Sequence, residues 1–271
     1  MRIVVCIKAV LDPDAVNSYA LDGRLIIGGD GKSLTQAAIP RLINAFDEQA
    51  IEAALRIRDS GANCTIAAVS VGTDANDILK HAAALGADEV VDVNVDAQTL
   101  DGHVTAVLLA AYIRTRGGAD LVLCGRQASD DDQGVVPALL GELLRMPVVT
   151  IARAVEMVPA SDPPAIRVTR VTRDGDETVA ARCPAVVTIS NEIGTPRYPT
   201  TAKKLAARRI RPAVLSAADL GVEPANLQPR VTLLRQSVPT VQGHCEILSA
   251  ATPAEVADQL FARLRADGAI S

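Results

Sequence analysis

Short apolar runs alternate with amphipathic segments through the first half of the chain. The runs are rich in branched side chains and are bounded by glycine or polar residues, which is typical of buried strands; they span residues 3–7, 65–71, 87–93 and 120–124. The segments between them have apolar side chains at helical spacing, at residues 44–57, 76–85 and 105–113. Because strands that alternate with helices form parallel sheets, the sequence predicts an α/β fold with a doubly wound, mostly parallel, Rossmann-like sheet.

Two stretches depart from this alternation and predict small antiparallel additions. Turn residues surround Leu25-Ile26-Ile27 within residues 12–40, which indicates a small β-hairpin inserted after the first strand. Further along, strands at residues 148–158 and 165–173 precede a turn at Asp174-Gly175-Asp176. Strands at residues 178–182 and 184–190 are expected to follow it.

The C-terminal part is expected to serve a partner. A short basic helix is expected over residues 202–210, while residues 211–239 lack periodicity and read as an extended arm. Long segments without structure are uncommon in compact domains, so the arm is expected to lie across another subunit; a loop packed on its own domain is the alternative. Residues 252–266 are expected to form an amphipathic helix. Thr252 is its expected N-cap, and Glu255 completes a capping box. We therefore divide the chain into residues 1–190, 191–211 and 212–271.

Composition excludes several classes of function. A net charge of −5 and an aromatic content of 2% give no basic stripe or stacking platform for nucleic acid. The five cysteines contain no CxxC pair and the three histidines lie far apart, so we expect buried free thiols in a reducing cytoplasm and no metal site. The N-terminal apolar run is too short for a signal peptide, and no apolar run reaches the roughly 20 residues of a membrane span.

The stretch LVLCGRQASDDDQGVVPALLGELLRMP, residues 121–147, is the candidate ligand site. A strand that ends at Cys124 is followed by Gly125, by the triplet Asp130-Asp131-Asp132 and by a helix from Val135. In open α/β sheets, ligands bind beyond the carboxyl ends of strands, and free N–H groups at a helix N-terminus suit an anion. The alternative is an ordinary loop in which the Asp residues cap the helix. No GxGxxG follows the first strand, so a dinucleotide reductase is not indicated.

Five segments in order resemble the β subunit of electron transfer flavoproteins, FixA-type proteins included. They are VVCIKAVLD, INAFDEQAIEAAL, HAAALGADEVV, LVLCGRQASDD, and the run VTRDGDETVAARCPAVVTIS with NEIGTPRYPTTAK. The resemblance covers nearly the whole chain. It implies a fold like that of the adenine nucleotide alpha hydrolases.

The resemblance also implies the function. Such a subunit pairs with an α subunit that carries FAD, and itself binds AMP, or a second FAD in electron-bifurcating members. The pair carries electrons from flavin dehydrogenases, such as the acyl-CoA dehydrogenases of fatty acid β-oxidation, to a membrane quinone oxidoreductase or another acceptor. No catalytic residues are expected in the chain itself.

Family contacts transfer to matching positions in this sequence. The implied nucleotide contacts are Cys6, Asn44, Ala45, Phe46, Asp47, Val71, Gly125, Arg126, Gln127, Ala128, Asp130, Gln133, Gly134 and Val135. Asn44 is also a plausible N-cap of the helix that follows it, and the amides of residues 133–135 are suited to phosphate. The implied partner contacts are Tyr198, Thr201, Lys204, Leu205 and Arg208.

Some matches are imperfect. Thr201 stands where the family often carries a docking leucine, so Leu205 is the alternative anchor, and Ala45 stands where the family usually has proline. The loop at residues 130–137 is compact beside the form common in bifurcating members, which favours AMP. The basic side chains around Lys204 are either a docking surface for an acidic partner or a solvated helix face.

One alternative belongs to another class, an ATP-binding or ATP-hydrolysing enzyme of the same fold. It predicts a Ser-Gly-Gly-x-Ser type of phosphate loop after the first strand, and IKAVLDPD contains none.

Overall fold

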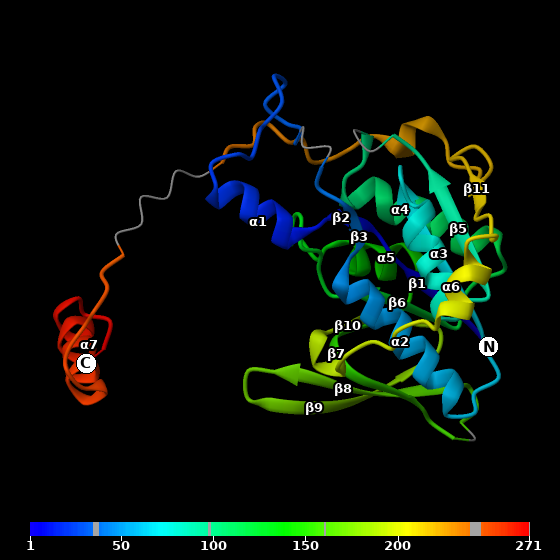
Figure 1. Ribbon diagram of the computed structural model, residues 1–271. Coiled ribbons are helices and arrows are strands. Elements are labelled where there is room, and N and C mark those ends of the chain that lie inside the picture. The colour runs from blue at the N-terminus through cyan, green and yellow to red at the C-terminus, as the bar shows by residue number, and fades with distance from the viewer. Residues whose placement is uncertain (35–37, 97–98, 160, 239–244, 271) are drawn as a thin grey trace. The chain divides into compact units, whose positions relative to one another are not determined.

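A nine-stranded sheet is the main element of the computed structural model, which describes residues 1–34, 38–96, 99–159, 161–238 and 245–270 (Figure 1). Within these residues the strand order is β11-β5-β4-β1-β6-β10-β7-β8-β9. The strands are β1 (Arg2–Cys6), β4 (Thr65–Gly72), β5 (Glu89–Asn94), β6 (Leu121–Gly125), β7 (Val148–Met157), β8 (Ala165–Thr172), β9 (Gly175–Arg182), β10 (Ala185–Ile189) and β11 (Ala213–Leu215).

Strand direction confirms the predicted fold class. The neighbours from β11 to β7 are parallel, and only the pairs β7–β8 and β8–β9 are antiparallel. The predicted hairpin after residue 165 is therefore present, with Thr172 and Gly175 paired at its tip. The parallel strands are continuous apolar runs because both of their faces are covered; every residue of β10 is buried.

Helices cover both faces of the sheet (Figure 1). One face packs on α2 (Ala45–Asp59) and α3 (Asn76–Leu85), and the other on α4 (Gly102–Thr115) and α5 (Val136–Leu144). The core contains little aromatic surface and consists of aliphatic side chains, with Tyr112 its largest fully buried member. The remaining helical elements are α1 (Pro13–Leu21), α6 (Thr201–Ala207), α7 (Pro253–Ala266) and short 3-10 turns at Asn191–Ile193 and Pro224–Leu227.

The insertion after β1 differs from the predicted hairpin. In the described part of residues 12–40, the expected strand pairing is reduced to a single bridge between Ile27 and Leu34. The first part of the insertion is helix α1, whose N-cap Asp12 accepts hydrogen bonds from the N–H groups of Asp14 and Ala15. Asp12-Pro13 is thus an N-cap followed by proline at the first helical position, not a turn. The ribbon at this end is formed instead by β2 (Ala9–Leu11) and β3 (Arg41–Ile43).

The segment after residue 211 is partly built into the chain's own domain. Strand β11 adds to the edge of the sheet beside β5. Further along, Asp101 Oδ2 accepts hydrogen bonds from the N–H groups of Arg230 at 2.6 Å and Val231 at 3.0 Å. Gln236 N–H donates to the carbonyl of Gly31 at 2.7 Å. The expectation of a segment without structure is therefore wrong for β11, whereas Arg230, Val231 and Gln236 lie in a stretch without helix or strand that is hydrogen-bonded to the chain's own domain.

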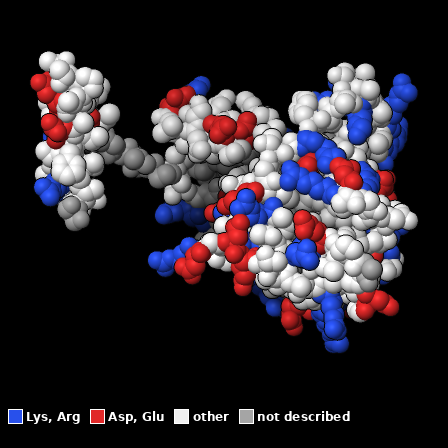
Figure 2. Space-filling model, turned by 90° about the horizontal axis from the view of Figure 1, so that it is seen from below, with Lys and Arg blue, Asp and Glu red and all other residues white. Residues whose placement is uncertain are grey.

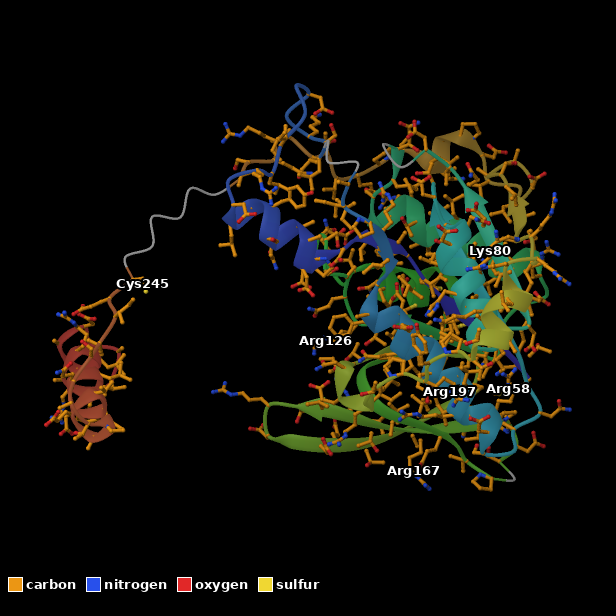
Figure 3. All side chains as sticks on the ribbon, viewed as in Figure 1. Arg58, Lys80, Arg126, Arg167, Arg197 and Cys245 are labelled. Carbon is orange, nitrogen blue, oxygen red and sulfur yellow. The ribbon has the colours of Figure 1, made fainter. Side chains whose placement is uncertain are left out.

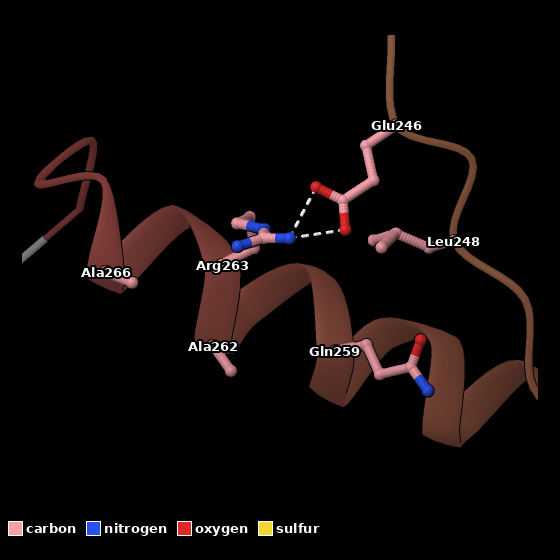
Figure 4. Close-up of a pocket in the computed structure, with 6 residues that line it drawn as sticks. All are labelled: Glu246, Leu248, Gln259, Ala262, Arg263 and Ala266. Carbon is pink, nitrogen blue, oxygen red and sulfur yellow. Dashed lines mark hydrogen bonds and ion pairs between the residues drawn. The ribbon is translucent and has the colours of Figure 1, made fainter. Parts of the chain in front are cut away.

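Two compact units divide the chain, Met1–Gln236 and Ser237–Ser271. In the second unit, the predicted capping box of α7 is confirmed, with Thr252 and Glu255 bonded to each other's backbone. Glu246 forms an ion pair with Arg263 of the helix beside a shallow hollow (Figure 4). All five cysteines are free thiols, but Cys245 is exposed and Cys64 and Cys183 are only partly buried, so the expectation of buried thiols holds for Cys6 and Cys124 alone.

Asp101 should contribute to the stability of the fold, because its carboxylate joins the start of α4 to the segment at residues 230–231. Besides holding the arm, its Oδ1 accepts the N–H of Val104 and caps α4. We expect Asp101→Ala to lower the free energy of unfolding by about 1–2 kcal/mol, because one cap and two tethering hydrogen bonds are lost. Denaturant unfolding measures the change, and limited proteolysis should cut the arm near residue 230 faster. Asp77→Ala, an acid in the first turn of α3 with no such tether, is the matched control; equal losses in both variants would contradict the tether.

Candidate functional site

Three strand ends meet at the carboxyl edge of the sheet. Strand β1 lies between β4 and β6, and all three are parallel. Cys6 therefore lies beside Cys124 of β6, and the end of β4 at Val71 follows on the other side. The order of connection reverses here, because the chain leaves β1 for one side of the sheet and later returns to place β6 on the other. This switch point is where open α/β sheets bind ligands.

Asp47 ties two of these strand ends together. Its Oδ2 accepts the N–H of Lys8 at 2.9 Å, just after β1, and its Oδ1 accepts the N–H of Gly125 at 3.1 Å, at the end of β6. Burial raises the pKa of the Asp47 carboxyl to about 7, although hydrogen bonds from Lys8, Asn44 and Gly125 pull it down. Gly125 has room for no side chain, since a Cβ there would lie 2.3 Å from Asp47 Oδ1.

Asn44 takes a different role from the predicted cap. It occupies the N-cap position of α2, but its side chain makes no capping hydrogen bond. Its Nδ2 instead donates to the carbonyl of Gln127 at 2.8 Å, which joins α2 to the loop after β6. The side chain is 1% exposed, and its Oδ1 has no partner among the described residues. A buried polar atom without a partner is costly, so this oxygen is suited to accept a hydrogen bond from a ligand.

The helix after the acidic loop begins without a side-chain cap. Val135 is the N-cap of α5 and makes no capping hydrogen bond, so the alternative in which the Asp residues cap this helix is wrong. Among the described residues, none accepts the N–H of Gly134 or Val135. Asp132 and Gly134 both have positive φ, 54° and 60°, and a Cβ on Gly134 would lie 2.8 Å from the carbonyl oxygen of Arg126. The open amides at this helix end can therefore hold an anion.

Lys8 faces the acidic loop and was missed by sequence reasoning. Its Nζ lies 2.8 Å from Asp130 Oδ2 and 4.0 Å from Asp131 Oδ2. Its backbone is fixed on both sides, by Asp47 at the N–H and by the N–H of Asn44 at the carbonyl. The available signal was its position directly after the first strand.

Arg126 is held by neighbouring side chains, and its Nε donates to Gln127 Oε1 at 3.0 Å. Its guanidinium lies over the Phe46 ring, 5.2 Å from the ring centroid, and Nη1 donates to Ser190 Oγ at 3.3 Å (Figure 3). The side chain therefore joins α2 to the end of β10. Of the predicted nucleotide contacts, the structure brings the backbones of Cys6, Gly125 and Gln127 together with Asn44 and Asp47. The Arg126 guanidinium instead contacts Phe46 and Ser190.

The predicted partner contacts form a separate surface on α6, which packs on α3. Tyr198 is 79% exposed and Leu205 54%, and Lys204 Nζ lies 3.8 Å from the centroid of the Tyr198 ring. Thr201 is the first residue of the helix, after the N-cap Thr200. Among the described residues, no hydrogen bond or ion pair joins these side chains to the loop at residues 125–135.

A buried carboxylate, Glu52, holds this second surface in place. It accepts hydrogen bonds from Nε of Arg197 at 2.7 Å, from the backbone N–H of Arg197 at 3.1 Å and from Nε of Arg56 at 2.8 Å. Burial alone would raise the pKa of Glu52, but the arginine hydrogen bonds outweigh it and keep that pKa below its usual 4.5. Neither Glu52 nor Arg197 was among the predicted site residues, although both lie in the segments that carry the resemblance.

A pocket of about 820 Å³ opens beside the acidic loop. Strand β2 provides an apolar wall with Val10 and Leu11, which Pro40 extends, and Arg41 of β3, Asp130 and Gln236 lie on its polar side. Its size is within the usual range of ligand pockets.

Other kinds of site find no support in the described residues. They contain no group of three or more His, Cys, Asp or Glu side chains placed to hold a metal ion. No helix among them is long and apolar enough to cross a membrane. On the face shown in Figure 2, acidic and basic side chains are interspersed.

The fold and the site define an α/β protein with an uncapped helix end beside the switch point of its sheet. Residues 33–219 match the family described as electron transfer flavoprotein domain. The CarD subunit of the caffeyl-CoA reductase–Etf complex of Acetobacterium woodii is 32% identical over 271 residues, 98% of each chain. The electron transfer flavoprotein β subunits of Clostridium acetobutylicum and Syntrophomonas wolfei are 32% and 30% identical, over 92% and 88% of this chain. The chain belongs to the electron transfer flavoprotein β-subunit family, whose members are electron carriers.

Asp47 should make stability depend on pH. Its pKa is about 7 in the folded protein and 3.8 as the ordinary value, so the folded state binds the proton more tightly. The contribution of Asp47 to stability is therefore fully present below about pH 4 and is lost as the pH rises to about 7. Asp47→Asn cannot ionise, so its free energy of unfolding should fall less between pH 4.5 and 7.5 than that of the wild type. Denaturant unfolding of both proteins across this range measures the slopes, and equal slopes would contradict the assignment.

Proposed function

We propose that the chain binds an adenine nucleotide, AMP, at the open end of α5. In complex with an FAD-carrying α subunit, it shuttles electrons from flavin dehydrogenases, such as acyl-CoA dehydrogenases, to a membrane quinone oxidoreductase or another acceptor. The observation that carries the proposal is that one loop is flanked by two unsatisfied groups. The helix that follows the loop has no side-chain cap, and Asn44, which is bonded to the loop at Gln127, has a buried Oδ1 without a partner among the described residues. A cytoplasmic location is part of the proposal, because all five cysteines are free.

Each part of the nucleotide has a group suited to it. The open amides of Gly134 and Val135 would hold the phosphate, as helix N-termini commonly do, and the Gln133 N–H would exchange its 3.4 Å hydrogen bond to Asp131 Oδ1 for one to the phosphate. Asn44 Oδ1 would accept a hydrogen bond from the adenine amino group or from a ribose hydroxyl. Asp47 would stay beneath the nucleotide as a brace between the strand ends, and Cys6 and Val71 would line the wall. The nucleotide is structural here, and the redox chemistry would be supplied by the FAD of the α subunit.

A second candidate is a bifurcating subunit that binds FAD at the same place. The pocket beside Asp130 favours it, because a volume of about 820 Å³ next to the phosphate loop could receive the rest of a dinucleotide. The relative CarD is named as part of a complex with caffeyl-CoA reductase, which also supports an acyl-CoA type of redox partner. The compact loop at residues 130–137 favours AMP.

The two remaining parts of the chain would bind partners. Residues 191–211 would meet the dehydrogenase through Tyr198, Thr201, Lys204, Leu205 and Arg208. Residues 212–271 would pack on the α subunit, and within its own unit α7 has no buried residue, which leaves its apolar face for a partner.

Nucleotide content of the purified heterodimer tests the proposal. The chain is co-expressed with its α subunit, and the nucleotides released on denaturation are identified and counted. One FAD and one AMP per heterodimer support the carrier, and two FAD support bifurcation. A chain that remains a monomer in the presence of the α subunit, or that hydrolyses ATP, would contradict it.

Gly134→Ala should empty the nucleotide site without unfolding the protein. Its Cβ would lie 2.8 Å from the Arg126 carbonyl at a φ of +60°, so the loop must move. We expect the co-purified nucleotide to fall to well under half of the wild-type content while the far-UV circular dichroism is unchanged. Gly117→Ala is the matched control, because Gly117 also has a positive φ, 81°, but nothing lies within 4 Å of the added Cβ. Equal nucleotide loss in both variants would count against the site.

Leu205 should act as the docking anchor in place of Thr201. Its exposed side chain can fill an apolar pocket, whereas Thr201 begins α6 and offers little apolar surface. We expect Leu205→Ala to raise the KM of the dehydrogenase reaction for the heterodimer roughly tenfold, as for a hot spot of about 1.4 kcal/mol, with little change in Thr201→Ala. A larger effect in Thr201→Ala would reverse the assignment.

A further inference from the structure

Three consecutive carboxylates stand beside the proposed phosphate site with a single cation opposite them. Asp130, Asp131 and Asp132 are separated by Gln133 alone from the open amides of Gly134 and Val135 at the start of α5. Within the described residues, Lys8 is the cation that forms ion pairs with this triplet, at 2.8 Å from Asp130 and 4.0 Å from Asp131. The neighbouring Arg126 is directed to Phe46 and Ser190 instead. The loop therefore keeps a local excess of negative charge next to a site that must bind an anion.

We propose that Lys8 and the triplet Asp130-Asp131-Asp132 form a charge filter, which admits adenine nucleotides with about two phosphate charges and rejects ADP and ATP. The inference rests on the proposed nucleotide site and adds its selectivity. AMP and the pyrophosphate diester of FAD each carry about two negative charges near neutral pH, whereas ADP carries about three and ATP about four. Each added charge meets the two carboxylates that Lys8 leaves unbalanced.

Lys8 should affect nucleotide affinity mainly through its charge, and not by holding the loop in position. The side chains of Lys8 and Asp130 are about two-fifths exposed, and exposed ion pairs add little to stability. The turn of the loop also has its own support, because Asp130 Oδ1 accepts the N–H of Asp131 at 2.9 Å. Asparagine at position 130 keeps that acceptor and removes only the charge. Charges near a partly buried anion still act over several ångströms, within the screening length of physiological salt.

Two opposite substitutions separate charge from position. Lys8→Met removes the cation and leaves three carboxylates unbalanced, so it should weaken ADP binding roughly tenfold, AMP binding roughly threefold, and adenosine binding not at all. Asp130→Asn breaks the same ion pair but removes a negative charge, so it should strengthen ADP binding. The double variant should return the ADP affinity close to the wild-type value.

Calorimetric titration of the full-length heterodimer, freed of its co-purified nucleotide, with adenosine, AMP and ADP measures these affinities. Lys80→Met is the matched control, since Lys80 lies on α3, which packs against β4, β5 and α6 (Figure 3). It should bind all three ligands like the wild type. Raising the salt from 50 to 500 mM should reduce the differences between Lys8→Met and wild type.

Several outcomes would overturn the charge filter. If Asp130→Asn weakens ADP binding as Lys8→Met does, the ion pair acts as a mechanical latch. If Lys8→Met leaves the ratio of AMP to ADP affinity unchanged, or if Lys80→Met has an equal effect, the selectivity does not come from Lys8. If the wild-type heterodimer binds AMP and the variants give one of these results, only the charge filter is overturned. If the wild-type heterodimer binds no adenine nucleotide, the proposed function and the charge filter are overturned together.

Discussion

The buried carboxylate of Asp47 is the interaction on which the site depends. It accepts N–H groups from the chain leaving β1 and from the last residue of β6, and so fixes the separation of two strand ends that are not consecutive in the sequence. Its place in the first turn of α2 favours the negative charge, while burial opposes it. Gly125 follows from this arrangement, because any side chain there would collide with the carboxylate. The loop that follows Gly125 therefore starts from a fixed point.

Helix α2 links the two surfaces of the molecule. Its N-terminal turn carries Phe46 and Asp47 at the sheet edge, and Glu52, farther along the same helix, holds Arg197 and the segment before α6. Asp47 and Glu52 are five residues apart on this helix, a rise of about 7.5 Å, so one rigid element fixes the separation of the two carboxylates. The two places resemble each other, because in each a buried carboxylate, Asp47 or Glu52, accepts hydrogen bonds from several donors. Such groups are costly when a donor is removed, which makes the geometry of both surfaces well defined.

The layers of the fold could be predicted because they depend on periodicity. Buried strands and amphipathic helices are visible in short windows, and the parallel sheet follows from their alternation. Two of the elements that were missed show the local reasons. Asp12-Pro13 has the composition of a turn and also of a helix start, and only the following residues' packing decides between them. Strand β11 is three residues long, and its pairing with β5 depends on the completed sheet edge.

The side-chain partners at the site could not be predicted in the same way, because they join distant positions. Lys8 and Asp130 are 122 residues apart, and Glu52 and Arg197 are 145 apart. Asp130-Asp131-Asp132 shows the consequence most clearly. In the sequence, three acids before a helix are good capping residues. If they capped the helix, their carboxylates would accept the hydrogen bonds of the helix amides. In the structure the acids bond to the loop and to Lys8, and the amides of Gly134 and Val135 stay open. Under the proposed function, this helix end, which no described side chain caps, would receive an anion from outside the chain, and the surplus of acids would limit how much negative charge that anion can bring.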